Sequence, residues 1–198
     1  MAITNGYCTL AQVKASARIT DSVDDDLLEL AVESASREID QACERNFYNA
    51  GTATRIFAAR DSYVAEIDDL ISIEHLKTDP EGDGNYAVTW QSGDYVLEPL
   101  NGISGGIAHP YTLIRARDTY LFPLENGEPL VEVKGVWGWS SVPTAITQAT
   151  VILASRIYKR NDSPLGVAGF GDLGVIRVGS LDPDVEALIH PFKKMRFA

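Results

Sequence analysis

Two amphipathic helical stripes, at residues 24–46 and 143–161, lie on either side of the middle of the chain and limit how it can fold. In the first stripe, apolar residues recur every three or four positions from Leu28 to Cys43, which is the spacing of one face of a helix. Between the stripes the period shortens and turn residues become frequent, which predicts short strands. Helices that flank a run of strands indicate an α+β protein rather than an alternating α/β one.

Local signals predict two further, shorter helices. Thr9 and Gln12 have the spacing of a capping box, in which each side chain bonds the backbone of the other, so a first short helix is expected to start there. Near the other end, Asp182 is expected to be the N-cap of a last helix, with Pro183 as its first residue and Pro191 as its stop. The four helices are expected to form a small bundle.

The region between the long helices is expected to be an antiparallel β insertion. Alternation is clearest around residues 131–137, and Gly, Asp, Asn and Pro separate the segments. The expected domains are a helical core of residues 1–50 and 140–198 and a β-rich insertion of residues 51–139. The expected strands are 54–58, 71–76, 86–90, 95–98, 113–116 and 130–136.

Charge and composition exclude several classes of protein. The formal net charge is −11, and an acidic body repels nucleic acid rather than binding it. The two cysteines are too few for a disulfide framework. No apolar run has the length of a membrane span, and the first residues lack the pattern of a signal peptide. We therefore expect a protein made in the cytoplasm, with reduced thiols and no membrane association.

Three sequence features that suggest ligand chemistry have simpler interpretations. The histidines stand far apart and lack the spacing of metal ligands. In the stretch 79–85, Asp79, Glu81 and Asp83 match the first positions of a calcium loop, but Trp90 stands where its bidentate glutamate would be, so a hairpin turn is expected. The glycine-rich stretches 102–106 and 166–171 lack the strand–loop–helix context of a phosphate site. No catalytic residue, metal site or cofactor is expected.

Trp137 and Trp139 allow two interpretations. Residues two apart on a strand point to the same face, so the pair could stack on a sugar. A large aromatic side chain is more often part of a core, and we expect at least one of the two indoles to close the β core against the helices.

The stretch 163–179 is the least ordinary part of the sequence. It contains five glycines, seven large apolar residues and only two charges, whereas loops are normally polar because they lie in water. It is expected to contact a neighbouring protein, such as an adjacent subunit; folding over its own domain is the alternative. The residues expected to make this contact are Leu165, Val167, Phe170, Leu173, Val175 and Ile176.

Several stretches together resemble one protein family. They are residues 7–14, 24–31, 39–47, 133–139, 142–143, 154–160, 162–166 and 181–185. With these pieces, which follow the family's order over nearly the whole chain, the chain resembles the head–tail connector, or adaptor, proteins of long-tailed bacteriophages and related gene-transfer particles.

The resemblance implies a structural, non-enzymatic protein of the virion neck. Such proteins form a dodecameric ring that joins the portal protein to a stopper or tail-completion protein, and DNA passes through the ring without sequence-specific binding. Two alternatives remain open: a carbohydrate-binding or tail accessory module of the virion, and an enzyme whose site is too dispersed to recognise. The resemblance also implies that the C-terminal segment docks on the portal, through Asp182, Pro183, Val185, Leu188, Ile189, Phe192, Lys193, Lys194 and Arg196.

Overall fold

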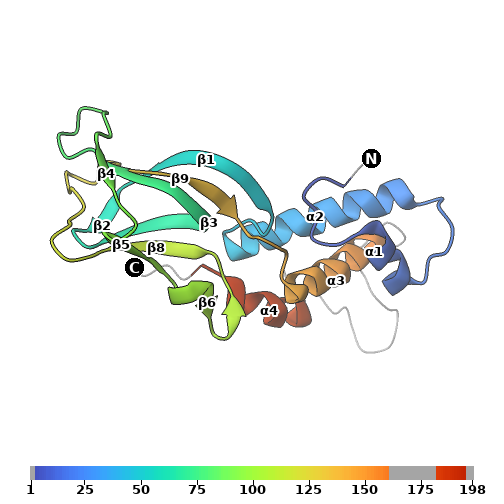
Figure 1. Cartoon of the computed structure of the whole chain (residues 1–198). Helices are drawn as coiled ribbons and strands as arrows, with labels where there is room; N and C mark the ends of the chain where they lie inside the picture. The colour runs from blue at the N-terminus through green and yellow to red at the C-terminus, as the bar shows by residue number, and fades with distance from the viewer. Residues whose placement is uncertain (1–2, 161–181, 195–198) are drawn as a thin grey trace. The chain divides into compact units, whose positions relative to one another are not determined.

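The computed structural model describes residues 3–160 and 182–194 and divides the chain into two units (Figure 1). The helical unit combines both ends of the chain, Met1–Phe47 and Val142–Ala198, and the sheet unit is Tyr48–Ser141. Helices and antiparallel strands are both present, so the predicted α+β class is confirmed.

The described residues of the helical unit form four α-helices. The long helix α2 packs against α3, α3 packs against α4, and α1 contacts both α2 and α3. Their shared core includes Val13, Leu28, Ile39 and Ile146, all of which are fully buried. The helices are α1 (Leu10–Ala17), α2 (Asp25–Cys43), α3 (Thr144–Arg160) and α4 (Pro183–Ile189), and a short 3₁₀ helix η2 (His190–Phe192) follows α4.

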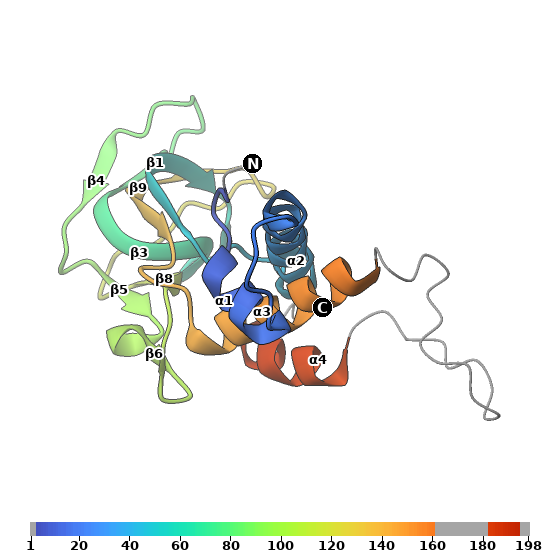
Figure 2. The same cartoon turned by 90° about the vertical axis from the view of Figure 1, so that its right-hand side faces the viewer.

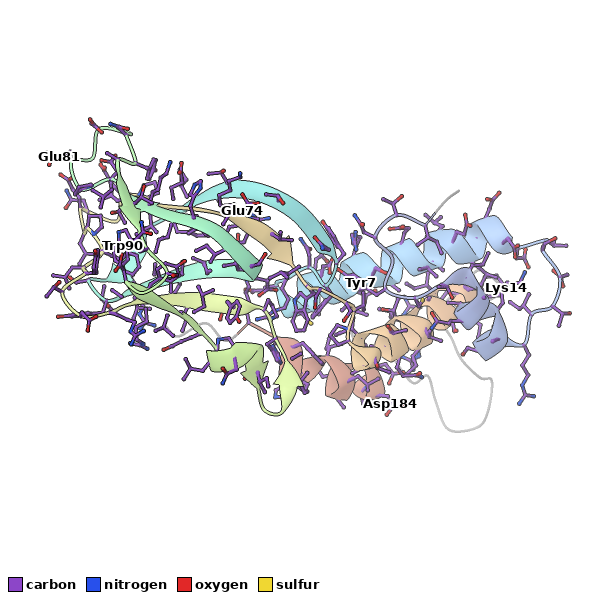
Figure 3. The ribbon with its side chains drawn as sticks, in the orientation of Figure 1. Tyr7, Lys14, Glu74, Glu81, Trp90 and Asp184 are labelled. Carbon is purple, nitrogen blue, oxygen red and sulfur yellow. The ribbon has the colours of Figure 1, made fainter. Side chains whose placement is uncertain are left out.

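The start of α1 confirms the predicted capping box. The Thr9 hydroxyl accepts the N–H of Gln12 at 3.2 Å, and the Gln12 side chain accepts the N–H of Thr9 at 2.8 Å. An ion pair then joins α1 to α2, with Lys14 Nζ lying 2.5 Å from Asp25 Oδ1; Lys14 is labelled in Figure 3. These local contacts fix α1 beside the beginning of α2.

Three helix ends differ slightly from the predicted ones. Helix α2 ends at Cys43, because Glu44 adopts a left-handed conformation with φ 55° and closes the helix. Helix α3 begins at Thr144, since the Pro143 carbonyl accepts the N–H of Thr147 at 3.0 Å. Pro191 ends α4 but does not end helical structure, because it lies within η2.

The sheet unit is built on a seven-stranded antiparallel sheet in which the main path of strands is β1-β9-β3-β8-β5 (Figure 2). Strands β2 and β4 pair with β3 beside that path, and β6 and β7 form a separate two-stranded hairpin that follows a 3₁₀ turn, η1 (Leu100–Gly102). The strands are β1 (Asn49–Phe57), β2 (Ala59–Asp61), β3 (Val64–Thr78), β4 (Val88–Trp90), β5 (Tyr95–Glu98), β6 (Ile103–Ser104), β7 (Ile107–Ala108), β8 (Tyr111–Ala116) and β9 (Val131–Gly138).

The centre of the sheet explains one glycine of the sequence. Gly135 lies in β9 opposite Ala53 of β1 and Ile73 of β3. A Cβ atom added at Gly135 would overlap the carbonyl oxygen of Ser72. The close approach of β9 and β3 therefore requires glycine at this position.

Both tryptophans of the 133–139 motif belong to the interior. Trp137 is fully buried and Trp139 is nearly so. The Trp137 indole donates to the carbonyl of Ala53 at 2.8 Å, and the Trp139 indole donates to Oδ2 of Asp69 at 2.9 Å. The core interpretation is confirmed, and the alternative of an exposed sugar-stacking platform is wrong because neither ring has a free face.

Candidate functional site

The C-terminal segment that was predicted to dock begins at a well-formed helix cap. The Asp182 carboxylate accepts the N–H of Asp184 at 2.8 Å and lies 2.5 Å from Nη2 of Arg156 on α3. Pro183 is the first residue of α4, where the absence of an N–H group removes no hydrogen bond of the helix. The predicted cap is therefore present, and an ion pair also connects it to the long helix α3.

The apolar residues of the segment face the inside of the helical unit. Val185 and Ile189 are fully buried and Phe192 is 2 % exposed, whereas Leu188 is half-buried and Pro183 is exposed. The three buried side chains hold α4 and η2 on their own unit, so they do not form a free apolar face. The exposed residues of α4 are Pro183, Asp184 and Ala187, and Asp184 is labelled in Figure 3.

Three aromatic rings connect the two ends of the chain inside this unit. The ring of Tyr7 meets that of Phe47 edge-on, with centroids 5.7 Å apart and an interplanar angle of 89°. Phe47 meets Phe192 in the same way, at 5.9 Å and 83°. Such edge-to-face pairs add to the stabilisation that comes from burial alone. We call Tyr7, Phe47 and Phe192 the aromatic clasp.

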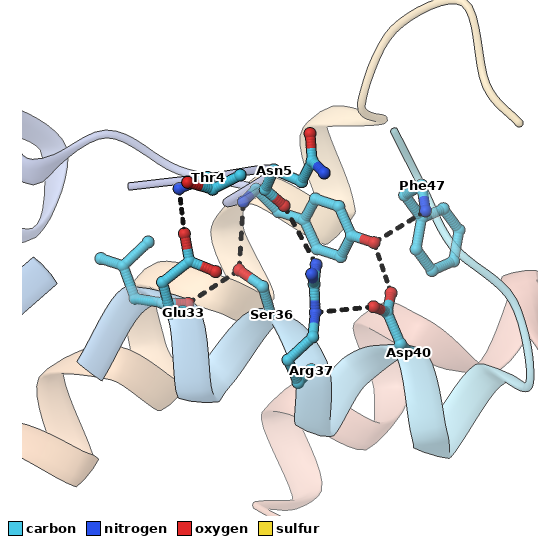
Figure 4. Close-up of polar contacts among 9 residues, drawn as sticks. Thr4, Asn5, Glu33, Ser36, Arg37, Asp40 and Phe47 are labelled. Atoms are coloured by element: carbon cyan, nitrogen blue, oxygen red, sulfur yellow. Dashed lines mark hydrogen bonds and ion pairs between the residues drawn. The ribbon is translucent and has the colours of Figure 1, made fainter. Parts of the chain in front are cut away.

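Hydrogen bonds fix the Tyr7 end of the clasp (Figure 4). The Tyr7 hydroxyl donates to Oδ1 of Asp40 and accepts the N–H of Phe47 at 2.8 Å. The Tyr7 N–H donates to the hydroxyl of Ser36 at 3.1 Å, and Arg37 Nε lies 2.9 Å from Oδ2 of Asp40. The segment before α1 is thus bound to the C-terminal half of α2.

Burial changes the acid–base properties of this cluster. It raises the pKa of the Asp40 carboxyl above its usual value, and the hydrogen bond from Tyr7 and the charge of Arg37 only partly oppose this effect. Burial, reinforced by the neighbouring Asp40, also raises the pKa of the Tyr7 hydroxyl far above its usual value. Tyr7 therefore stays protonated and serves as a donor at physiological pH.

The basic residues at the end of the segment are partly engaged within the unit. Lys193 Nζ lies 2.6 Å from Oε1 of Glu186, and the Lys194 N–H donates to the Cys43 carbonyl at 3.1 Å. Both lysine side chains are half-buried. Arg196 lies outside the described residues.

The predicted contact loop also lies outside the described residues. This applies to all six of its residues, Leu165, Val167, Phe170, Leu173, Val175 and Ile176.

The stretch 79–85, which matches the first positions of a calcium loop, has a structural role in the sheet unit. Asp79, which is buried, accepts the N–H groups of Gly82 and Gly84 at 2.9 Å and 2.7 Å, so its loop is a hairpin connection between β3 and β4. Glu81 lies in the same loop and is exposed (Figure 3). Within residues 3–160 and 182–194, no group of three or more His, Cys, Asp or Glu residues is arranged to hold a metal ion. Of the helices in those ranges, none combines the length and the hydropathy needed to cross a bilayer.

Comparison with known proteins gives a match to one family. Residues 7–100, just under half of the chain, match the family described as phage gp6-like head-tail connector protein. The match includes α1, α2 and strands β1 to β5, so it contains Tyr7, Asp40 and Phe47 of the clasp and its hydrogen bonds. The resemblance inferred from the sequence motifs is confirmed.

Solved structures resemble this chain over its full length. One is described as the neck of an empty GTA particle computed with C6 symmetry; its matched chain is 18% identical, with a TM-score of 0.59, and the alignment covers 100% of the chain described here and 95% of that chain. Another is the neck of a native GTA particle computed with C12 symmetry, with a TM-score of 0.53, 18% identity and coverage of 100% and 94%. At this identity the likeness establishes the fold. None of the curated proteins matches the chain.

The clasp is the part of the site that sequence reasoning missed. Tyr7 and Phe47 stood in two of the pieces that carried the family resemblance, but nothing in their spacing indicated contact. Phe192 was assigned to portal docking instead. The sequence signal that could have indicated the clasp is that the pieces 7–14 and 39–47 each contain an aromatic residue within four residues of a helix end.

Proposed function

We propose that this chain is a structural protein of the virion neck that joins the portal to the tail-completion proteins. The observation that carries this proposal is the match of residues 7–100 to the head–tail connector family. The fold likeness to neck chains over the full length agrees with it. No chemistry is required of such a protein, and the polar clusters described above serve as helix caps, turns and ties between segments.

The symmetry of the similar neck structures supports a ring. One similar structure is described as a neck computed with C12 symmetry, and we propose that this chain forms a dodecameric ring around the DNA path. With a net charge of −11, the ring would repel DNA rather than bind it, so that DNA slides through the lumen. In each copy the four helices form the bundle that carries the docking segment, and the sheet unit is the insertion.

Portal docking is proposed for the outer side of the C-terminal segment. Because Val185, Ile189 and Phe192 are buried, the contact would use exposed residues of α4, such as Pro183, and the basic end at Lys193, Lys194 and Arg196. Deleting residues 181–198 would not be a clean test, since it also removes three core side chains. Charge reversal at the end of the chain avoids that problem.

The test uses the triple variant Lys193→Glu, Lys194→Glu and Arg196→Glu. We expect it to keep its thermal stability within a few degrees but to lose co-sedimentation with portal-bearing capsids. A matched control, Lys159→Glu with Arg160→Glu, changes exposed basic residues on α3 and should still co-sediment. Capsids that bind the triple variant and the unchanged protein equally would refute docking through this segment.

The stretch 163–179 is proposed to contact a neighbouring neck protein. Its composition supports this, because glycine lets a backbone follow a foreign surface and the apolar side chains supply contact area. The double variant Phe170→Ser with Leu173→Ser should fold normally and yield capsids without tails in electron micrographs. Tails attached at the normal frequency would contradict the proposal.

A further inference from the structure

Strand β1 leaves a long edge of the sheet unpaired. It is nine residues long, stands at one end of the sheet path, and pairs with β9 alone among the strands of the described chain. Six of its nine residues are exposed, including Thr52, Ala53 and Thr54, and Ile56 is 53 % exposed. An exposed row of unpaired N–H and C=O groups is a template for a strand of another chain.

Two usual protections of an edge strand, proline and several charged residues, are missing from β1, and its one irregularity lies at its start, between Asn49 and Gly51. It contains no proline, and its one charged residue is Arg55. That guanidinium lies over the ring of Trp137, 4.6 Å from its centroid, and bonds Asp68 at 2.8 Å. Its charge is therefore engaged within the sheet unit and does not prevent another strand from pairing with β1. By contrast β5, at the other end of the path, has only four residues and is followed by Pro99, which has no N–H.

The hairpin β6–β7 is an exposed β element at the opposite border of the sheet unit. Figures 1 and 2 both show β1 and β6 on opposite sides of this unit. Residues 103–108 are all exposed, with Ile103 at 55 % and Ile107 at 40 %. The two strands pair only with each other among the described strands. The hairpin therefore presents apolar side chains and free backbone groups to the outside.

The hairpin has a defined shape that suits it to docking. Its tip is Gly105–Gly106, with φ of 58° and 80°, and no atom would touch a Cβ placed at either residue. Two glycines at positive φ match the tight turn that follows the twist of a hairpin. Its base is closed by the N–H of His109, which donates to the carbonyl of Gly102 at 2.8 Å.

We propose that the β6–β7 hairpin of one copy adds to the β1 edge of the next copy in the ring. This inference rests on the ring proposed above. Both elements are almost free of charge in a chain with 28 acidic and 17 basic residues, so two copies can meet there without the repulsion that their acidic surfaces produce. Each element has backbone N–H and C=O groups along an edge that no described strand pairs with, and each can supply hydrogen-bond partners for the other, as in other cases of strand addition.

The pairing of two unlike surfaces also explains why a ring forms rather than a dimer. A ring needs heterologous contacts, in which one patch of a subunit meets a different patch of its neighbour. Two β1 edges paired with each other would instead form a closed twofold dimer. Because the edge and the hairpin lie at opposite borders of the sheet unit, each copy can contact one neighbour through each of them.

Cysteine crosslinking tests this contact in particles and in the purified protein. The variant combines Thr54→Cys with Ile107→Cys, and a short flexible bismaleimide tolerates small shifts of register. The native cysteines Cys8 and Cys43 are buried, so the unchanged protein is the background control. We expect a ladder of covalent multimers from particles that carry both new cysteines, and no ladder from either single variant.

Two outcomes would overturn the inference while leaving the proposed function intact. One is the absence of a ladder in particles whose necks contain normal amounts of the double variant. The other is covalent dimers from Thr54→Cys alone, because these would show that two β1 edges face each other. Failure of the unchanged protein to enter particles at all would instead contradict the proposed function.

Edge-blocking substitutions provide a second, independent test. Thr52→Lys with Thr54→Lys places two lysines along β1, a device that natural edges use to prevent pairing. We expect loss of ring formation with an unchanged melting temperature of the monomer. The control Val88→Lys changes an exposed residue of β4 and should form rings normally. Normal rings from the β1 variant would overturn the inference.

Discussion

The ring of Phe192 meets the ring of Phe47 edge-on at 5.9 Å, and this contact attaches the C-terminal segment to the end of α2. Both rings are almost completely buried. The helical unit therefore depends on a residue only a few positions from the end of the described chain.

Phe192→Ala should destabilise the helical unit strongly. Removing a buried phenylalanine leaves a cavity and typically costs about 3–5 kcal/mol of unfolding free energy. The measurement is urea denaturation followed by helical circular dichroism. Leu124→Ala is the matched control, because Leu124 is 54 % exposed, and its unfolding free energy should change by less than about 0.5 kcal/mol. Similar losses in both variants would contradict the assigned role of Phe192.

Asp40 should make stability depend on pH. Burial raises the pKa of its carboxyl in the folded state above the unfolded value, so the folded protein binds this proton more tightly. The resulting stabilisation is complete below the unfolded pKa and is lost as pH rises through the raised folded pKa. Asp40→Asn should remove this part of the pH dependence while still accepting a hydrogen bond from Tyr7.

The measurement for Asp40 is the unfolding free energy at several pH values, from acidic to neutral. Glu38→Gln is the control, since it removes one carboxylate from the same helix. If Asp40→Asn and the unchanged protein show parallel pH curves, then the burial of the carboxyl does not govern this dependence.

Gly135→Ala should destabilise the sheet unit. The added methyl group would overlap Ser72 O, so β9 and β3 would have to separate; overpacking of this kind typically costs about 1–3 kcal/mol. Gly93→Ala is the control, because nothing lies within 4 Å of a Cβ placed there. Thermal unfolding of both variants is the measurement, and equal melting temperatures would mean that the close approach is not required.

The two thiols should react slowly in the folded protein. Burial raises the pKa of both Cys8 and Cys43 to about 11, and the thiolate is the reactive form. With an aromatic disulfide reagent at pH 8, we expect little reaction until denaturant is added and then two equivalents of released thiol. Fast labelling of the native protein would show that these sites open readily.

Local signals in the sequence predicted the parts of the fold that local contacts determine. The capping box of Thr9 and Gln12 could be predicted because both partners lie within four residues of each other. The first half of β3 could not, because Asp68 and Asp69 are unfavourable in strands. Their partners are Arg55, on the earlier strand β1, and Trp139, which is 70 residues away from Asp69.

In the candidate site, too, contacts between neighbouring residues could be predicted from the sequence, whereas contacts between distant segments could not. Asp182 and Pro183 predicted the start of α4, and the structure has it there. The sequence also showed that α4 has an apolar face, but not which surface that face would meet. Burial of Ile189 and Phe192 depends on residues near position 43, on a segment that precedes the whole sheet unit.

The joining of both chain ends in one unit has a consequence for synthesis. A nascent chain emerges from the ribosome with Tyr7 and Phe47 first, and Phe192 follows only after the whole sheet unit has been made. Domains generally fold as units, so we expect the helical unit to become stable only once the segment with Phe192 has emerged. Polypeptides that stop before this segment would then be open to proteolysis and absent from assembled necks, so that α4 and η2 would act as a check on synthesis before assembly.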